Sequence, residues 1–115
     1  SKMIKIYHNS RCSKSREGVC FLEENKADFK IINYLEDKLS FSDLEEILSI
    51  LKIKPIDLVR TKEVIWKENF KDKKLSDGEI IQAMVDYPKL IERPIVINDR
   101  KGVVARPSSL IVSII

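Results

Sequence analysis

The N-terminal third of the chain contains two short apolar runs separated by an amphipathic segment. Residues 3–7 (MIKIY) and 29–34 (FKIINY) are rich in β-branched and aromatic residues, a pattern typical of buried strands. Residues 13–25 contain no proline and carry Val19 and Leu22 on an apolar stripe, which predicts a helix. Two strands joined by a helix indicate a parallel βαβ unit.

The next segment, residues 42–51, predicts a second helix. Leucine and isoleucine recur there on one helical face, which we expect to pack on the sheet. Ser42, followed three residues later by Glu45, has the spacing of a capping box that opens the helix.

Residues 55–91 predict a mostly helical insertion. Pro55 favours the start of a short helix that runs to about residue 60, and a charged stretch follows it. Ser76 with Glu79 has the spacing of a capping box, and the helix that it opens is closed by Pro88.

The C-terminal segment predicts a β-hairpin and a last helix. The run PIVIN (94–98), the turn DRKG (99–102) and residues 103–105 form the hairpin, and Pro107 starts the helix. The element order is therefore β-α-β-α, helical insertion, β-β-α. This order predicts an α/β protein with a mixed four-stranded sheet, folded as one domain over residues 1–115.

The composition argues against membrane proteins and nucleic-acid-binding proteins. With 43% hydrophobic and 34% charged residues, the 115-residue chain resembles ordinary globular proteins, and no apolar run is long enough to cross a membrane. The N-terminus has no signal-peptide pattern, so we expect a cytoplasmic protein without a membrane partner. A net charge of +3, from 21 bases and 18 acids, does not indicate a nucleic-acid partner.

Candidate chemistry is concentrated in the loop SRCSKSR, residues 10–16. Cys12 lies where the first strand gives way to a helix, and unpaired N–H groups and the helix dipole at such a position favour the thiolate. Arg11, Lys14 and Arg16 would add positive charge. His8 could add more if protonated, or act as a proton partner. The loop therefore predicts a nucleophilic cysteine that meets an anion.

The second cysteine is not expected to resolve an adduct on the first. Cys20 lies in the same predicted helix about 12 Å along its axis, whereas a disulfide needs Cα atoms about 4.4 to 6.8 Å apart. We expect Cys20 to pack as a small apolar residue. Position 15 is serine, so the C-x-x-C dithiol motif is absent and a resolving thiol must be external. One loop cysteine and one histidine do not predict a metal site.

Five motifs follow one another over essentially the whole chain: YHNSRCSKSR after the first strand, NYLED after the second, LVRTKE, ERPIVIN and ARPSSL. Taken together and in this order, they resemble the glutaredoxin-dependent arsenate reductase family. The resemblance implies a thioredoxin-like fold with a helical insertion. It also implies that Cys12 is catalytic and that Arg60, Arg93 and Arg106 line an oxyanion site.

These three arginines suit such a site chemically, because planar guanidinium groups bind tetrahedral oxyanions through paired hydrogen bonds. Arg93 precedes Pro94, a proline that in thioredoxin-like folds is typically cis and faces the active cysteine. We also expect four residues to support the site: His8, Ser15, Arg16 and Pro94.

The resemblance further implies an activity in arsenical resistance. Cys12 would attack arsenate, glutathione would serve as co-substrate and attack the adduct, and glutaredoxin would reduce the resulting mixed disulfide, with no bound cofactor. Two alternatives remain. One is a general oxidoreductase acting on glutathione mixed disulfides, with the arginines binding glutathione carboxylates. The other is a regulator of the Spx type that binds RNA polymerase, although such regulators usually carry C-x-x-C where this chain has Ser15.

Overall fold

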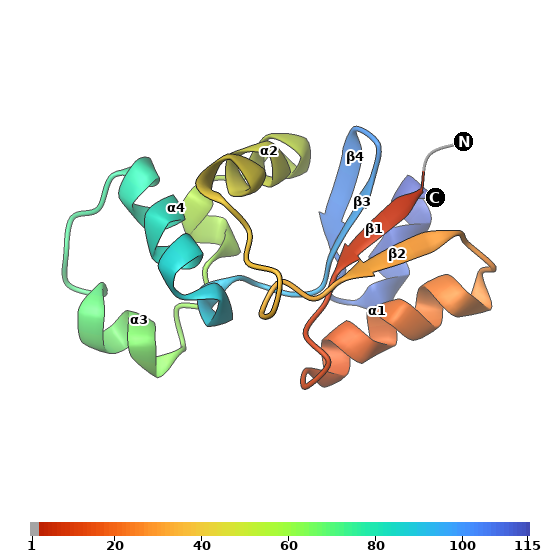
Figure 1. Cartoon of the computed structure of the whole chain (residues 1–115), viewed down its shortest axis with the longest axis horizontal. Coiled ribbons are helices and arrows are strands. Elements are labelled where there is room, and N and C mark those ends of the chain that lie inside the picture. Colours follow the sequence, from red (N-terminus) through yellow and green to blue (C-terminus); the bar gives the residue numbers. More distant parts are fainter. Residues whose placement is uncertain (1–2) are drawn as a thin grey trace. The chain divides into compact units, whose positions relative to one another are not determined.

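The computed structural model describes residues 3–115. In it the chain forms two compact units (Figure 1). The first unit comprises residues up to Asp37 together with Arg93–Ile115, and the second is Lys38–Glu92. The expected insertion, 55–91, lies inside the second unit, which also holds the helix expected over 42–51. None of the helices in residues 3–115 combines the length and the apolar character needed to cross a bilayer.

The first unit is built on a four-stranded mixed sheet. Its strands are β1 (Ile4–Tyr7), β2 (Phe29–Ile32), β3 (Ile95–Asn98) and β4 (Lys101–Val104), in the spatial order β2-β1-β3-β4. β1 pairs with β2 in parallel and with β3 antiparallel, and β3 and β4 form the expected hairpin. Its turn is shorter than predicted, because Asn98 pairs with Lys101 and β4 already begins there instead of at residue 103. This architecture confirms the predicted α/β class and the mixed sheet.

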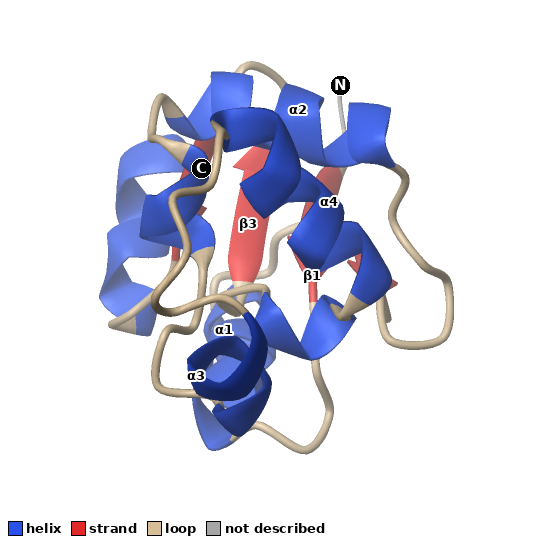
Figure 2. Ribbon diagram, turned by 90° about the vertical axis from the view of Figure 1, so that its left-hand side faces the viewer, coloured by secondary structure: helices blue, strands red, loops and turns tan. Residues whose placement is uncertain are grey.

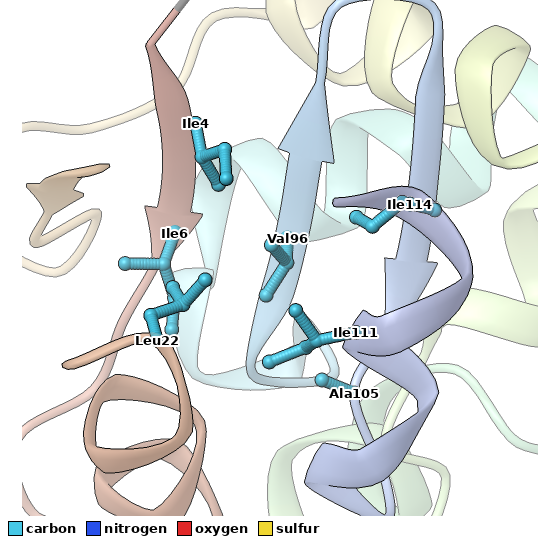
Figure 3. Close-up of a cluster of buried hydrophobic side chains, with 7 residues drawn as sticks. All are labelled: Ile4, Ile6, Leu22, Val96, Ala105, Ile111 and Ile114. Carbon is cyan, nitrogen blue, oxygen red and sulfur yellow. The ribbon is translucent and has the colours of Figure 1, made fainter. Parts of the chain in front are cut away.

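Helix α1 (Ser13–Glu24) and the 3-10 helix η3 (Ser108–Ile114) bury the main core of this unit. Figure 3 shows its seven buried side chains, which come from β1, α1, β3, the residue after β4, and η3: Ile4, Ile6, Leu22, Val96, Ala105, Ile111 and Ile114. A fully buried leucine or isoleucine contributes about 1.5–3 kcal/mol. Ile4 and Ile6 are two positions apart on β1 and so lie on the same face of the sheet. Their burial therefore determines which face of the sheet α1 covers.

The second unit contains helices and one isolated β-bridge, between Val59 and Ile91. Its elements are α2 (Phe41–Leu51), η1 (Pro55–Leu58), α3 (Val64–Asn69), α4 (Asp77–Asp86) and η2 (Pro88–Leu90). Figure 2 shows α2 and α4 as two of its helices, and these two pack against each other. Leu44 and Ile47 of α2 and Met84 of α4 are buried in this unit.

Two further local predictions are corrected by the structure. The capping box of α2 uses Ser40 and Asp43 in place of Ser42 and Glu45, so the N-cap lies two residues earlier than expected. The hydroxyl of Ser40 accepts from the amide of Asp43 at 3.1 Å, and the carboxylate of Asp43 accepts from the amide of Ser40 at 3.0 Å. The last helix is of the 3-10 type, although it follows Pro107 as expected. The capping box of α4, Ser76 with Glu79, is as predicted.

Gly18 lets α1 approach the strand β3 closely. A Cβ atom placed on Gly18 would lie 3.0 Å from Cγ of Pro94 and 3.2 Å from Cδ1 of Ile6. Both neighbours are buried and have little freedom to move. Gly18 is thus required by packing, even though glycine lowers helix propensity.

We therefore expect Gly18→Ala to destabilise the protein by about 1–2 kcal/mol, since the overpacking cost exceeds the gain in helix propensity. Urea unfolding followed by circular dichroism measures the change. Gly78→Ala is the matched control, because its added Cβ would meet nothing closer than Cζ of Phe41 at 3.9 Å. That variant should be neutral or more stable by up to about 1 kcal/mol. Equal losses in both variants would contradict the packing argument.

Candidate active site

Cys12 is the residue that caps the N-terminus of α1. Its backbone is extended (φ −98°, ψ 122°), and the amide of Arg16 donates to its carbonyl oxygen in the first turn of the helix. The amide of Cys12 itself donates to the carbonyl of Asn9 at 3.0 Å, which closes the loop that follows β1. The side chain is half-buried and its thiol is free. The predicted placement at a strand-to-helix junction is thus observed.

The surroundings of Cys12 lower the pKa of its thiol below the ordinary value. Burial is the largest single influence and acts in the opposite direction, because it disfavours the charged form. The backbone amides of Ser15 and Lys14 and the guanidinium of Arg93 together outweigh it. Helix-terminal N–H groups and one buried cation therefore favour a thiolate at this position.

Arg93 and Arg106 reach Cys12 from neighbouring strand ends. Arg93 lies directly before β3, its peptide bond to Pro94 is cis as expected, and Arg106 follows β4. The hairpin brings these positions together, and the amide of Ala105 donates to the carbonyl of Pro94 at 2.9 Å. Nη2 of Arg106 lies 3.9 Å from Sγ of Cys12.

Arg93 is the more deeply buried of the two arginines, with 8% of its surface exposed. Burial alone would lower the pKa of its guanidinium, but its contacts with Cys12 and with Tyr34 raise that pKa overall. Arg93 therefore remains a cation beside the sulfur. Two of the three predicted oxyanion ligands are thus brought to Cys12, and an anion bound there would face guanidinium donors and helix amides.

His8 and Ser15 form a buried polar pair beneath the loop. Nδ1 of His8 lies 2.8 Å from Oγ of Ser15, and that oxygen accepts from the amide of Asn9 at 3.0 Å. The amide of Asn9 is a donor and therefore uses only the oxygen of the Ser15 hydroxyl. The hydroxyl hydrogen of Ser15 can then be donated to Nδ1 of a neutral His8. The pKa of His8 is lowered, chiefly by burial and further by the charge of Arg16, against a contribution from the Ser15 backbone that raises it.

The lowered pKa favours the neutral imidazole, which disfavours the first of the two roles expected for His8, that of a positive charge near Cys12. Its role as a proton partner stays a prediction. The pair instead fixes Ser15, whose side chain is fully buried and whose amide lowers the pKa of Cys12.

Two basic side chains of the loop, Arg16 and Lys14, make local contacts of their own. Nη1 of Arg16 donates to the carbonyl of Ser10 at 2.8 Å, so this arginine braces the loop backbone. Nζ of Lys14 lies 3.6 Å from a carboxylate oxygen of Glu17 on the exposed face of α1. Lys14 lowers the pKa of Cys12 through its backbone amide, whereas the charge that does so belongs to Arg93.

Cys20 is exposed, and the prediction that it packs in the core is wrong. The buried positions of α1 are Ser15, Gly18 and Leu22, which share one face of the helix. Cys20 lies two residues from Gly18, about 200° around the helix axis, and so faces away from the sheet. This placement agrees with the expectation that Cys20 does not pair with Cys12.

Arg60, the third predicted ligand, belongs to the helical unit and is held there by two carboxylates. Its Nε donates to Oε1 of Glu63 at 3.3 Å and its Nη1 donates to Oε1 of Glu92 at 2.9 Å. The amide of Arg60 also donates to the carbonyl of Leu90 at 2.7 Å, beside the isolated bridge. Its role as an oxyanion ligand stays a prediction.

Sequence reasoning missed two residues around Cys12. Asn9 orders the loop, because its Oδ1 accepts from the amide of Arg11 at 3.0 Å; an asparagine just before a helix is a usable signal for such a turn. Tyr34 interacts with Arg93 from the turn after β2, and no spacing rule connects the two positions. Within residues 3–115, no three His, Cys, Asp or Glu side chains are grouped so that they could hold a metal ion.

Comparison with known proteins identifies relatives over the full length of the chain. The model of the ArsC family matches residues 7–114. The uncharacterized protein YfgD of Escherichia coli (strain K12) is 44% identical, and the match covers 100% of this chain and 98% of that protein. An arsenate reductase of Haemophilus influenzae is 40% identical over 97% of this chain and 98% of its own length.

Solved structures show the same fold. The arsenate reductase from Vibrio cholerae superposes with a TM-score of 0.94 at 37% sequence identity, and the match covers 100% of this chain and 99% of that one. Together with the sheet order described above, this similarity confirms the thioredoxin-like fold that the sequence motifs implied.

The buried, neutral His8 predicts a defined dependence of stability on pH. Its pKa is lower in the folded protein than in the unfolded chain, so the unfolded chain binds the extra proton first. The free energy of unfolding should therefore be fully retained above the ordinary histidine pKa and should fall as pH drops below it. Urea midpoints between pH 7.5 and 5 measure the effect. Because the chain has one histidine, His8→Asn should flatten this part of the profile; an unchanged slope would contradict the assignment.

Removing the cation at position 93 should raise the pKa of the Cys12 thiol. Iodoacetamide alkylation followed across pH gives the apparent thiol pKa, and Cys20→Ser is the background because Cys20 is exposed and would also react. Arg93→Gln should move the profile to higher pH, since a thiolate beside a buried guanidinium loses its partner. Arg100→Gln removes an exposed arginine from the β3–β4 turn and should leave the profile in place. Equal shifts in the two variants would mean that the thiol pKa depends only on the net charge of the protein, which would contradict a specific role for Arg93.

Proposed function

The chain belongs to the ArsC family, the family of the arsenate reductases, and from this premise we propose that it reduces arsenate to arsenite with Cys12 as the nucleophile. The observation that carries the proposal is the combination at one helix N-terminus of a thiol with a lowered pKa and two arginines, Arg93 and Arg106. A thiolate alone would repel an oxyanion. Guanidinium groups and helix amides compensate both negative charges at once.

The first step that we propose is attack by the Cys12 thiolate on the arsenic of bound arsenate. A sulfur–arsenic bond forms and an arsenate oxygen leaves as water after protonation. Arg93 would stabilise the thiolate before the attack, and Arg106 would bind arsenate oxygens. Arsenic remains in its oxidised state in this adduct.

A second thiol is needed for the reduction itself. In the proposal, glutathione thiolate attacks Sγ of Cys12, a sulfur–sulfur bond forms, and the electron pair of the sulfur–arsenic bond passes to arsenic, which leaves as arsenite. Exposed Cys20 and buried Ser15 support an external thiol over an internal one. Glutaredoxin would then reduce the Cys12–glutathione disulfide and return the thiolate, in the reducing environment of the cytoplasm.

An NADPH-coupled assay with glutathione, glutaredoxin and glutathione reductase tests the proposal. We expect arsenate-dependent NADPH consumption that Cys12→Ser abolishes and Cys20→Ser leaves essentially intact. Arg106→Lys should lower kcat/KM for arsenate by about tenfold or more, because a lysine keeps the charge but loses the paired donors.

Three results would count against it. Turnover that persists in Cys12→Ser would show that Cys12 is not the nucleophile. The absence of arsenate-dependent turnover would show that arsenate is not the substrate. Activity on a glutathionylated peptide without any need for arsenate would instead favour a general oxidoreductase of glutathione mixed disulfides.

A further inference from the structure

Tyr34 lies at the start of a well-anchored turn after β2. The carbonyl of Asn33 accepts from the amides of Glu36 at 3.1 Å and Asp37 at 2.9 Å, and Oδ1 of Asn33 accepts from the amide of Leu35 at 3.3 Å. The side chain of Tyr34 is fully buried. A phenol hydroxyl is buried at little cost only when it finds a polar partner.

The turn that holds Tyr34 and the loop that holds Cys12 leave the sheet side by side. They follow β2 and β1, which pair in parallel, so both begin at the same edge. The amide of His8 donates to the carbonyl of Ile32 at 2.9 Å and joins the two segments just beyond the strands. The position of Tyr34 relative to the catalytic loop is therefore set by the sheet register.

Arg93 connects the two residues. Its buried side chain interacts both with the thiol of Cys12 and with the phenol of Tyr34. A guanidinium carries donors only, so the phenol oxygen acts as the acceptor. An arginine side chain loses rotamer freedom when it is fixed, and a buried acceptor that is itself immobile keeps it in one orientation.

We infer that Tyr34 is a positioning residue that holds the guanidinium of Arg93 beside the sulfur of Cys12. It would act through the arginine, because its complete burial leaves no phenol surface for a bound anion. The consequence for arsenate reduction rests on the proposed function, whereas the consequence for the thiol does not.

The test is the alkylation profile of Cys12 in the Cys20→Ser background, without arsenate. Tyr34→Phe keeps the ring and its packing but removes the acceptor. We expect the thiol pKa to rise and the rate constant at the midpoint of the parent profile to fall about two- to threefold. The same substitution should lower kcat/KM for arsenate, while the urea midpoint checks that the variant remains folded.

A double-mutant cycle separates positioning from a general structural effect. If Tyr34 acts through Arg93, adding Tyr34→Phe to Arg93→Gln should cause no further shift of the alkylation profile. Tyr87→Phe is the matched control; it removes a phenol hydroxyl from an exposed tyrosine of the helical unit and should leave the profile unchanged.

Two outcomes for Tyr34→Phe would overturn the inference. One is an unchanged or lowered thiol pKa in Tyr34→Phe, and the other is an equal shift with and without Arg93. Should Tyr34→Phe prove unstable, Tyr34→His retains an acceptor nitrogen and should stay closer to the parent profile than Tyr34→Leu; equal profiles for these two variants would also overturn it. Because alkylation needs no arsenate, a failed arsenate assay would contradict the proposed function and leave this inference in place.

Discussion

The candidate site depends on holding the thiol of Cys12 beside the charged guanidinium of Arg93 in a partly desolvated place. Burial disfavours the thiolate of Cys12, and burial also disfavours the cation of Arg93. Each charge compensates the other, and the helix amides of Lys14 and Ser15 add donors that need no reorganisation when the thiolate forms. A thiol on an open surface would lack this compensation, and the same thiol without Arg93 would have a higher pKa.

Several structural features serve this one pairing. The close approach of α1 to Pro94 at Gly18 sets the distance between the helix end and the start of β3. The hairpin places Arg106 beside Arg93, and the buried His8–Ser15 pair fixes an amide that faces the sulfur. These contacts all lie within the first unit, so the chemistry assigned to Cys12 and these two arginines belongs to the sheet and its helices.

The lack of an internal resolving thiol has a simple structural basis. A serine hydroxyl occupies the third position after Cys12, where a dithiol enzyme would carry its second cysteine, and here it bonds to His8. Cys20 points away from the sheet because it lies nearly opposite Gly18 on the helix. Neither position therefore offers a second thiol that could release an adduct formed on Cys12. In the proposed function, an external thiol therefore follows from the geometry of one helix.

The sequence by itself determined the local features: the strands, the start of α1 at Cys12, the capping box at Ser76, and the motifs that identify the family. These depend on periodicity, turn chemistry and residue type within a few positions. It did not determine the orientation of Cys20, the neutral state of His8, or which base stabilises the thiolate. The tertiary structure decided these, because the exposed face of α1 and the burial of His8 depend on packing against the sheet. The cation beside Cys12 is Arg93, which lies 81 positions away along the chain and meets Cys12 only through the pairing of β1 with β3.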